Sequence, residues 1–456
     1  MIMTQRQSLD ILKLGNNVFL TGSAGSGKTY VLNSYIEYLK NKGISVGITA
    51  ATGVAATHLN GMTINSWAGI GIKSTLSEME IVQLLRRSYL RKRYLNTQVL
   101  IIDEVSMLTG EMLMLIDRLA RECRGNDLLF GGIQVVLCGD FFQLPPIARN
   151  SESNEETVFL YESEIWERMD LKICYLDTEY RQEDTDFLHV LHEIRGNSIC
   201  RDSIKRLAGR IYKKLDDELL PTKLYTLNVN IDAINTRELA KIPGEEHAFL
   251  MRDKGNVYLS DVMKRNCLAP ERLVLKKGAF VMFVKNNLEK RYVNGTLGTV
   301  IDFDAGGYPI VETHAKDVIV VPPSVWKIEE EGEVSAEIEQ IPLRLAWAIS
   351  IHKSQGMSLD AAEIDLRNPF LPGMGYVALS RVRTLEGIRL LGLNHKALLV
   401  SEKILLFDKE LQELSRSAVS ELREIEWSDK ENLQRDFIHI VKRGGYRQSY
   451  LILQSG

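Results

Sequence analysis

Apolar residues in the first third of the chain fall into short runs that alternate with stretches of helical spacing. The runs are nearly continuous in apolar character, as expected for parallel strands covered on both faces. The first run leads directly into a glycine-rich segment, and the residues after Lys28 place apolar side chains at helical spacing. An α/β fold built on a parallel sheet is therefore predicted. Its expected strands are residues 18–20, 45–48, 99–102 and 133–137.

A second α/β pattern begins near residue 170. Between Gly295 and Gln340 the pattern changes to short β-rich segments with turns, which predicts a small β-barrel inserted into the second unit. A shorter charged insertion, 73–94, is expected in the first unit, and an amphipathic stripe after Asp408 predicts a helix packed on the body of the protein. The expected strands of the second unit are residues 224–226, 279–284, 345–349, 363–366 and 388–391.

Composition narrows the class of protein. The chain has 456 residues, enough for about two to four domains. No apolar stretch approaches the about 20 residues that cross a bilayer, and the N-terminus lacks the apolar core of a secretion signal. The five cysteines are scattered without a CxxC pair, which predicts a cytoplasmic protein with neither a disulfide framework nor a zinc site. A net charge of −4 argues against a wholly basic nucleic-acid coat but allows a local basic groove.

The glycine-rich segment after the first strand fits the phosphate-loop pattern GxxxxGK[ST]. Such a loop binds phosphate because backbone N–H groups and a helix N-terminus point at the anion. Lys28 would supply a cation to the β- and γ-phosphates, and the Thr29 hydroxyl would bind Mg²⁺. The predicted nucleotide-binding residues are Gly22, Ser23, Ala24, Gly25, Ser26, Gly27, Lys28 and Thr29.

Acidic and amide side chains follow two later strands of the same sheet. Asp103 and Glu104 come after the run 99–102, where the first carboxylate can hold Mg²⁺ through water and the second can take a proton from an attacking water. Gln143 follows the next strand and can orient that water. Open α/β sheets bind ligands at the carboxyl ends of their strands, so these groups should share one rim with the phosphate loop. The paired acids and the lack of an NKxD guanine signature favour ATP.

Two arginines in the second unit are candidates for fingers, side chains that neutralise charge on the transferring phosphoryl group. Arg381 ends the segment Tyr376-Val377-Ala378-Leu379-Ser380-Arg381, and Arg181 lies in the segment 179–182. Both could reach the phosphates only if the second unit closed on the first. This arrangement predicts a motor in which two lobes act on one nucleotide.

Taken together, these motifs resemble those of superfamily-one helicases of the 5′-to-3′ branch, and within it the Pif family. The likeness runs from about Gln5 to about Leu406. Its most specific part, residues 124–126, 130–134 and 139–146, is similar to the segment that separates Pif-type from RecD-type enzymes. The other similar blocks are residues 49–56, 61–67, 101–107, 222–225, 278–282, 293–298, 346–356 and 376–381.

The resemblance implies further contacts on this chain. Gln5 would contact adenine, and Gly356 would belong to the ATP site. Asn65 stands where the family usually has histidine, Trp67 where it often has phenylalanine, and Met374-Gly375 where it has Gln-Ala. The DNA-binding residues implied are Thr52, Gly53, Val54, Asn65, Asn228, His352, Lys353 and Ser354.

It also implies two RecA-like domains and an activity. The expected domains are 1A at 1–170 with a wedge insertion 1B at about 73–94, 2A at 171–294 and 341–408, an SH3-like insertion 2B at 295–340, and a C-terminal helical extension at 409–456. The expected activity is ATP- and Mg²⁺-dependent 5′-to-3′ translocation on single-stranded DNA with unwinding of forked duplex and G-quadruplex DNA. The protein is expected to be associated with the nucleoid and to be a monomer in the absence of DNA. Its expected roles are in replication, repair, recombination or telomere maintenance.

Three other classes stay open at this point. An RNA-directed motor of the Upf type would be stimulated by RNA as well as DNA. A nucleotide-switched scaffold would bind DNA without stepping. An ATPase of another phosphate-loop family, such as a transporter subunit, is disfavoured because the chain lacks an LSGGQ-like signature and has a second α/β lobe.

Overall fold

The computed structural model describes the chain as two compact units. Unit 1 comprises the described residues within Met1–Phe141, Pro145–Tyr180 and Leu406–Gly456, and unit 2 those within Phe142–Leu144 and Arg181–Leu405. The side chains of residues 54, 57, 58, 266, 329, 330 and 333 are not described. The described residues are 3–71, 75–143, 159–178, 184–215, 220–225, 231–285, 287, 292–330, 333–351, 354–355, 357–367 and 372–443.

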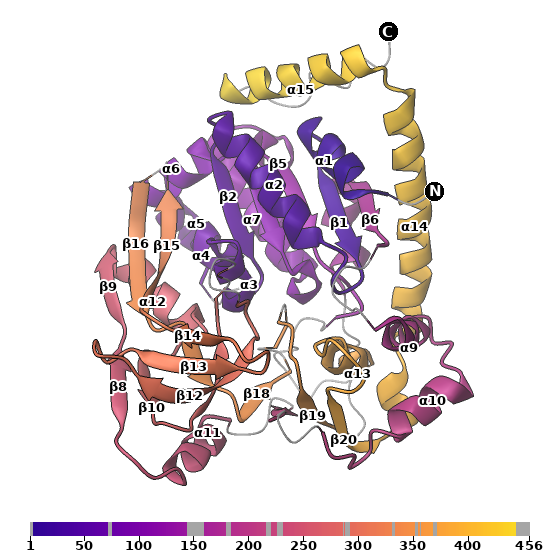
Figure 1. Ribbon diagram of the computed structural model, residues 1–456. Coiled ribbons are helices and arrows are strands. Elements are labelled where there is room, and N and C mark those ends of the chain that lie inside the picture. Colours follow the sequence, from indigo (N-terminus) through magenta and orange to yellow (C-terminus); the bar gives the residue numbers. More distant parts are fainter. Residues whose placement is uncertain are drawn as a thin grey trace. The chain divides into compact units, whose positions relative to one another are not determined.

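Unit 1 is built on a parallel sheet, as its apolar runs predict (Figure 1). Within the described residues the sheet has six strands in the order β3-β2-β4-β5-β1-β6, and every pairing is parallel. The predicted strands correspond to β1, β2, β4 and β5. The two additional strands are β3, only two residues long, and β6, which follows residue 170. The bounds are β1 Val18–Gly22, β2 Val46–Ala50, β3 Met62–Thr63, β4 Val99–Asp103, β5 Gln134–Cys138 and β6 Lys172–Leu176.

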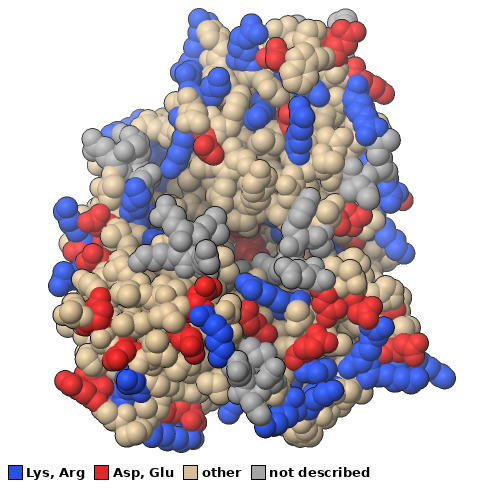
Figure 2. Space-filling model, in the orientation of Figure 1, with Lys and Arg blue, Asp and Glu red and all other residues tan. Residues whose placement is uncertain are grey.

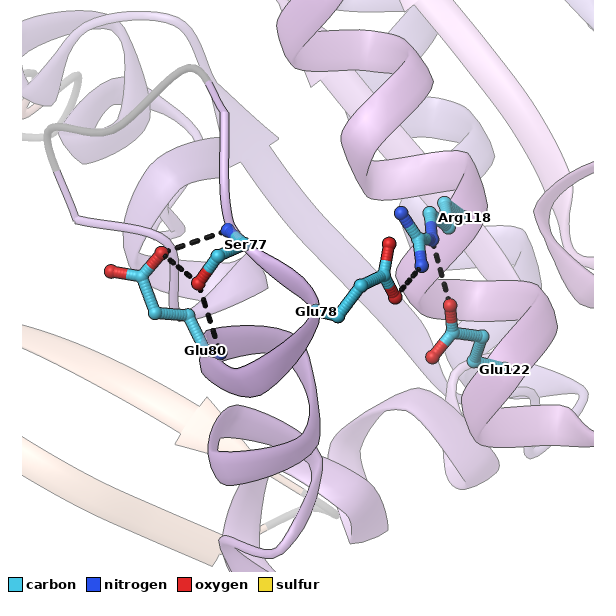
Figure 3. Close-up of polar contacts among 5 residues, drawn as sticks. All are labelled: Ser77, Glu78, Glu80, Arg118 and Glu122. Atoms are coloured by element: carbon cyan, nitrogen blue, oxygen red, sulfur yellow. Dashed lines mark hydrogen bonds and ion pairs between the residues drawn. The ribbon is translucent and has the colours of Figure 1, made fainter.

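Several helices of unit 1 begin at residues whose side chains cap the free N–H groups of the first turn. Thr4 and Ser77 form capping boxes with Gln7 and Glu80, and Thr109 accepts from the Met112 amide. Figure 3 shows the second of these boxes. The helices are α1 Gln5–Lys13, α2 Lys28–Asn41, α3 Gly53–His58, α4 Ile64–Ala68, α5 Glu78–Leu85, α6 Ser88–Asn96, α7 Gly110–Arg124 and α8 Glu164–Arg168, with 3-10 turns η1 Val105–Met107, η2 Leu129–Gly132 and η3 Leu160–Glu162.

Residues 124–134, which include the first two parts of the most specific sequence block, hold α6 against the rest of unit 1. The Arg124 guanidinium donates to the carbonyls of Tyr94, Leu95 and Thr97 at 3.0, 3.2 and 3.0 Å, and to Gly131 O at 2.8 Å. The carbonyls at the C-terminal end of α6, which have no partner within the helix, are thereby satisfied by a cation. Arg124 therefore has a structural role in unit 1.

The C-terminal helices complete the core of unit 1. They are α14 Glu402–Glu424 and α15 Trp427–Lys442. The apolar stripe after Asp408 lies on α14, where Ala418 and Leu422 are buried, and Phe437 of α15 joins the same core cluster. A hydrogen bond from Gln98 Nε2 to Val441 O, at 2.6 Å, fixes the end of α15. The amphipathic stripe therefore packs on the body of the protein, as predicted.

Unit 2 contains a small parallel sheet and three antiparallel ones. Within its described residues the orders are β18-β7-β19-β20 for the parallel sheet, β14-β13-β12-β11-β17 and β15-β16-β9 for the two larger antiparallel sheets, and β10-β8 for a pair. The strands are β7 Thr222–Tyr225, β8 His247–Leu250, β9 Arg252–Gly255, β10 Arg272–Leu275, β11 Phe280–Phe283, β12 Leu297–Phe303, β13 Pro309–Thr313, β14 Val318–Val320, β15 Ser324–Glu330, β16 Glu333–Gln340, β17 Leu343–Leu345, β18 Ala348–Ser350, β19 Ala362–Leu366 and β20 Ile388–Leu393.

The strand expected at 345–349 is instead two strands in different sheets. β17 ends at Leu345 and pairs with β11, whereas β18 begins at Ala348 and pairs with β7. Because both strands are buried, the apolar run continues from β17 into β18. The sequence pattern therefore does not show where the chain passes from one sheet to the other. The helices of unit 2 are α9 Thr185–Arg195, α10 Arg201–Ala208, α11 Ile231–Ala240, α12 Val257–Asn266 and α13 Met374–Leu379, with a 3-10 turn η4 His395–Leu398.

Surface charge agrees with the small net charge. On the face drawn in Figure 2, basic and acidic side chains are interspersed over both units. None of the described helices combines the length and apolar content that spanning a bilayer requires.

Candidate nucleotide and DNA site

The phosphate loop connects β1 to α2 in unit 1. Gly22 and Gly27 have φ angles of +142° and +89°, in the region that favours glycine. A Cβ at Gly22 would lie 2.2 Å from Leu176 O, so the residue must also be small. Gly27 directly precedes the first residue of α2, and the free N–H groups of that helix therefore open onto the loop.

Two polar groups of the loop are prepared for an anion. Lys28 Nζ donates to the carbonyls of Gly22 and Ser23, both at 2.8 Å, which holds the ammonium against the loop. The Ser26 hydroxyl is buried and has no hydrogen-bond partner among the described residues. An unsatisfied buried hydroxyl beside a fixed cation fits a phosphate oxygen. Thr29 is exposed at the first turn of α2.

The paired acids lie at the carboxyl end of β4. Burial raises the pKa of the Asp103 carboxyl, whereas hydrogen bonds from the Cys138 thiol and the Glu104 amide, together with the Lys28 ammonium, act to lower it. The effect of Lys28 places its charge close to Asp103, as the shared rim predicts. The Glu104 amide donates to Asp103 Oδ1 at 2.8 Å.

Glu104 itself has a strained backbone. Its φ of +54° is in the left-handed region, which costs a residue with a side chain of order 1–3 kcal/mol and is concentrated at functional sites. The carboxylate of Asp103 and the hydroxyl of Thr29 are the hard oxygen ligands that Mg²⁺ prefers. The residues at this rim therefore fit a magnesium–nucleotide complex.

Gln143 lies a few residues beyond β5. Its side chain is buried, and its Oε1 has no hydrogen-bond partner among the described residues. A buried amide without a partner is costly unless a ligand or water completes it. Although Gln143 follows β5 of the unit 1 sheet in sequence, it belongs to unit 2, as does Arg381.

Arg381 follows the short helix α13 in unit 2. Its guanidinium is 1% exposed and donates to Val377 O at 3.0 Å and to Ser380 Oγ at 2.9 Å. The side chain is thus anchored on the last turn of its own helix.

The implied DNA contacts that can be described come from both units. Thr52 Oγ1 accepts from the Ala55 amide at 3.2 Å and so caps α3, which begins at Gly53. Asn65 lies half-buried on α4. Ser354 in unit 2 is fully buried and donates to Ile351 O at 2.7 Å, which holds the turn after β18.

The short helix α4 is itself held by the basic segment that follows. Arg93 Nη1 donates to the carbonyls of Ser66 and Trp67 at 3.1 and 2.8 Å. Trp67 is 2% exposed and meets Tyr94 edge-on at 4.7 Å between ring centroids. Trp67 therefore packs in the core of unit 1.

Several predicted site residues lie outside the described part of the chain. They are Arg181, Asn228, His352, Lys353 and Gly356, together with the side chain of Val54. Gln5 is described and begins α1, where it is half-buried.

Two residues with functional potential were not among the predicted site residues. Gln355 is buried, and neither its side-chain oxygen nor its nitrogen has a partner among the described residues. It lies within the similar block 346–356, which is the signal that could have identified it. The Cys138 thiol forms a hydrogen bond with the Asp103 carboxyl, because β5 pairs with β4 in the sheet. The spacing of residues in the sequence does not reveal this pairing.

Two family models match the chain. One is described as PIF1-like helicase and matches residues 3–196, and the other as the 2B domain of DNA helicase Pif1 and matches residues 259–303. The ATP-dependent DNA helicase Pif1 of Psychrobacter sp. (strain PRwf-1) is 41% identical, with 97% of this chain and 75% of the relative covered. The ATP-dependent DNA helicase Pif1 of Bdellovibrio bacteriovorus is 34% identical, with 90% and 92% covered.

Solved structures show the same likeness. Pif1 of Bacteroides sp. in complex with ADP-AlF4 is 29% identical with a TM-score of 0.74, covering 91% of this chain and 98% of the other. Pif1 of Bacteroides in complex with ADP-AlF3 and single-stranded DNA is 30% identical with a TM-score of 0.59, with the same coverage. Pif1 helicase of Candida albicans is 34% identical with a TM-score of 0.70, covering 90% and 100%.

Proposed function

The chain belongs to the PIF1-like helicase family and is an ATP-dependent DNA helicase, and from this premise we propose how its own residues divide the work. The Lys28 ammonium and the amides of the phosphate loop bind the β- and γ-phosphates. Thr29 and Asp103 would hold Mg²⁺, and the ion would neutralise phosphate charge when bound. The observation that carries this assignment is Lys28, which is fixed by two loop carbonyls within electrostatic reach of Asp103.

We assign the chemistry of hydrolysis to three described side chains. Glu104 takes a proton from the attacking water, and Gln143 orients that water with its unsatisfied amide. Arg381 neutralises charge on the transferring phosphoryl group, an effect typically of about 10³–10⁵ in rate. We also propose Arg181 as a second arginine finger, and this assignment rests on the family resemblance alone.

We also propose the direction and the track. The protein moves 5′ to 3′ along single-stranded DNA and unwinds forked duplex and G-quadruplex DNA. It is a monomer in the absence of DNA and is associated with the nucleoid. Structures of Bacteroides Pif1 contain single-stranded DNA, and another Pif1 structure concerns unwinding at forked duplex DNA by two coordinating helicases, which supports a DNA track. Contacts to phosphates and stacking on bases would carry little sequence information, as a translocase needs.

The proposed contacts and domains extend the same picture. Thr52, Gly53, Val54 and Asn65 would bind the strand on the first domain. Asn228, His352, Lys353 and Ser354 would bind it on the second, and Gln5 and Gly356 would complete the ATP site. The proposed domain boundaries are those expected from the sequence: 1A at 1–170, 2A at 171–294 and 341–408, 2B at 295–340 and a helical extension from 409.

Strand displacement tests activity and direction together. The wild-type protein should release a strand from a 5′-tailed duplex and leave the matching 3′-tailed duplex intact, only with ATP and Mg²⁺. Lys28→Ala should abolish DNA-stimulated hydrolysis while DNA binding persists, whereas Lys42→Ala, at the other end of α2, should behave as wild type. Equal release from the 3′-tailed duplex would refute the polarity, and turnover by Lys28→Ala would refute the phosphate-loop assignment.

The same assay separates the remaining alternatives. Equal stimulation by single-stranded RNA and DNA would favour the RNA-directed motor. Tight DNA binding with nucleotide-dependent affinity but no displacement would favour a switch. Both outcomes are distinguishable from inactivity, because hydrolysis and DNA binding are measured separately.

A further inference from the structure

The segment that carries Gln143 changes its packing partners within two residues. Phe141 belongs to unit 1, where its ring lies 5.4 Å from Phe19 and 5.8 Å from Phe407, between centroids. Phe142 belongs to unit 2, and so does Gln143. The residue next to the proposed water-orienting amide is therefore held by unit 2.

Phe142 is held there by a buried arginine. The Arg195 guanidinium, at the end of α9, lies over the Phe142 ring at 3.9 Å from its centroid. Both side chains are buried, Arg195 being 8% and Phe142 2% exposed. A cation stacked on an aromatic face is held more strongly away from water than the same pair at a surface.

The same guanidinium also contacts the helix that precedes Arg381. Arg195 Nη1 donates to the Tyr376 hydroxyl at 3.3 Å, and the rings of Phe142 and Tyr376 meet at 67° with centroids 6.4 Å apart. Helix α13 adds a backbone contact, since a Cβ at its N-cap, Gly373, would lie 3.0 Å from Phe142 O. Figure 1 shows α9 and α13 as neighbours in unit 2.

These contacts form one rigid connection from Phe142 through Arg195 to Tyr376. Gln143 is covalently next to one end of it. Arg381 follows the helix at the other end and is anchored to that helix through Val377 O. The backbone that carries Gln143 is thus packed against the helix that precedes Arg381 within unit 2, although more than two hundred residues of sequence separate Gln143 from Arg381.

We propose that Arg195 is a positioning residue for ATP hydrolysis: it fixes Gln143 to the helix of Arg381, so that amide and finger approach the triphosphate as one body. The inference rests on the proposed function, because it takes the roles of Gln143 and Arg381 from there. Arg195 touches neither nucleotide nor water in this account. It acts through Phe142 and Tyr376.

The test separates positioning from folding. Arg195→Met keeps the length and apolar stem but removes the cation and the hydrogen bond. DNA-stimulated kcat should fall about 10²-fold, the size of effect expected from a displacement of about 1 Å at a reacting centre. The KM for ATP and the affinity for ADP should stay within about twofold, since the phosphate loop is untouched, while affinity for ADP with aluminium fluoride, which mimics the transition state, should fall with kcat.

Milder variants give graded and independent readouts. Tyr376→Phe removes only the hydrogen bond and should lower kcat several-fold, whereas Arg195→Lys should restore part of what Arg195→Met loses. The double variant Phe142→Leu/Arg195→Met should have a kcat only slightly lower than that of either single variant, because both changes break the same connection. The matched control is Arg206→Met on α10, whose guanidinium pairs with Asp186 at the surface; it should retain wild-type kcat.

Three outcomes would overturn the inference. One is an Arg195→Met protein with a lowered Tm but wild-type kcat, and another is a parallel loss of ADP and transition-state affinity. The third is strict additivity of Arg195→Met and Phe142→Leu in kcat. If Arg195→Met does not fold, wild-type kcat in Tyr376→Phe would count against the inference in the same way. Failure of the proposed function itself is recognised separately, because the wild-type protein would then lack DNA-stimulated hydrolysis.

Discussion

The contact between the turn after α1 and the C-terminal helix α15 supports a quantitative prediction. Gly15 has a φ of +80°, and a Cβ built there would lie 2.3 Å from Cδ2 and 2.8 Å from Cε2 of Phe437. Phe437 is 6% exposed and belongs to the core cluster of unit 1. The glycine therefore serves two purposes at once, a left-handed helix end and a close approach to an aromatic ring.

The free-energy changes follow from these two purposes. Phe437→Ala should destabilise the protein by about 3–5 kcal/mol, as expected for a buried phenylalanine. Gly15→Ala should cost about 1–2 kcal/mol for the left-handed backbone and a further ~1–3 kcal/mol for the clash with the ring. In the double variant the Phe437 ring is absent, so Gly15→Ala costs only the free energy of the left-handed backbone and not that of the clash. The double variant should thus be more stable than the sum predicts by about 1–3 kcal/mol.

Urea unfolding followed by far-UV circular dichroism measures these quantities. Phe437→Ala should also lower Tm by about 2–4 °C for each kcal/mol in a unit of this size. Trp427→Ala, at a 65% exposed position on the same helix, is the matched control and should change the free energy of unfolding by less than about 0.5 kcal/mol. Additive effects of the Gly15 and Phe437 changes would refute the reasoning, because they would show that the two residues do not touch in solution.

Three further predictions concern residues outside the proposed chemistry. Arg124→Met should lower the free energy of unfolding in urea by about 2–3 kcal/mol, because four backbone carbonyls lose a charged donor. The control is Arg118→Ala, which removes the surface ion pairs drawn in Figure 3 and should leave Tm unchanged. Equal effects of the two changes would contradict this reasoning. Burial lowers the pKa of His314, so the folded protein protonates this side chain at a lower pH than the unfolded chain does. Stability should therefore fall as the pH drops below about 6.5, and the stability of His314→Gln should fall less in melts from pH 7 to 5. Gly375→Ala should lower Tm strongly because its Cβ would lie 1.9 Å from Ala397 O, and an unchanged melt would show that the backbone can move aside.

The last of these predictions also accounts for one departure from the family pattern. Gly375 occupies a position where the resemblance expects alanine, and in this structure the backbone carbonyl of Ala397 fills the space of a side chain. The sequence showed that the residue was unusual. Only the packing of η4 against α13 supplies the reason.

The sequence by itself determined the parts of the protein that depend on local chemistry. The apolar runs predicted β1, β2, β4 and β5 because a buried parallel strand has no polar face. The spacing of glycines before Lys28 predicted the phosphate loop because only such a backbone brings N–H groups onto an anion. The strand ends then predicted that Asp103 would lie near Lys28, and in the structure the Lys28 ammonium acts to lower the pKa of the Asp103 carboxyl.

Tertiary structure decided what depends on residues distant in sequence. No local pattern distinguishes one buried apolar run from two strands in different sheets, as at 345–349, or shows that a two-residue strand such as β3 completes a sheet. Nor could spacing reveal that Phe142 packs on Arg195 and Tyr376, or that α15 closes over Gly15. Those contacts form only when the whole chain has condensed, because packing energy depends on which surfaces meet, whereas strand and loop preferences are set by neighbouring residues.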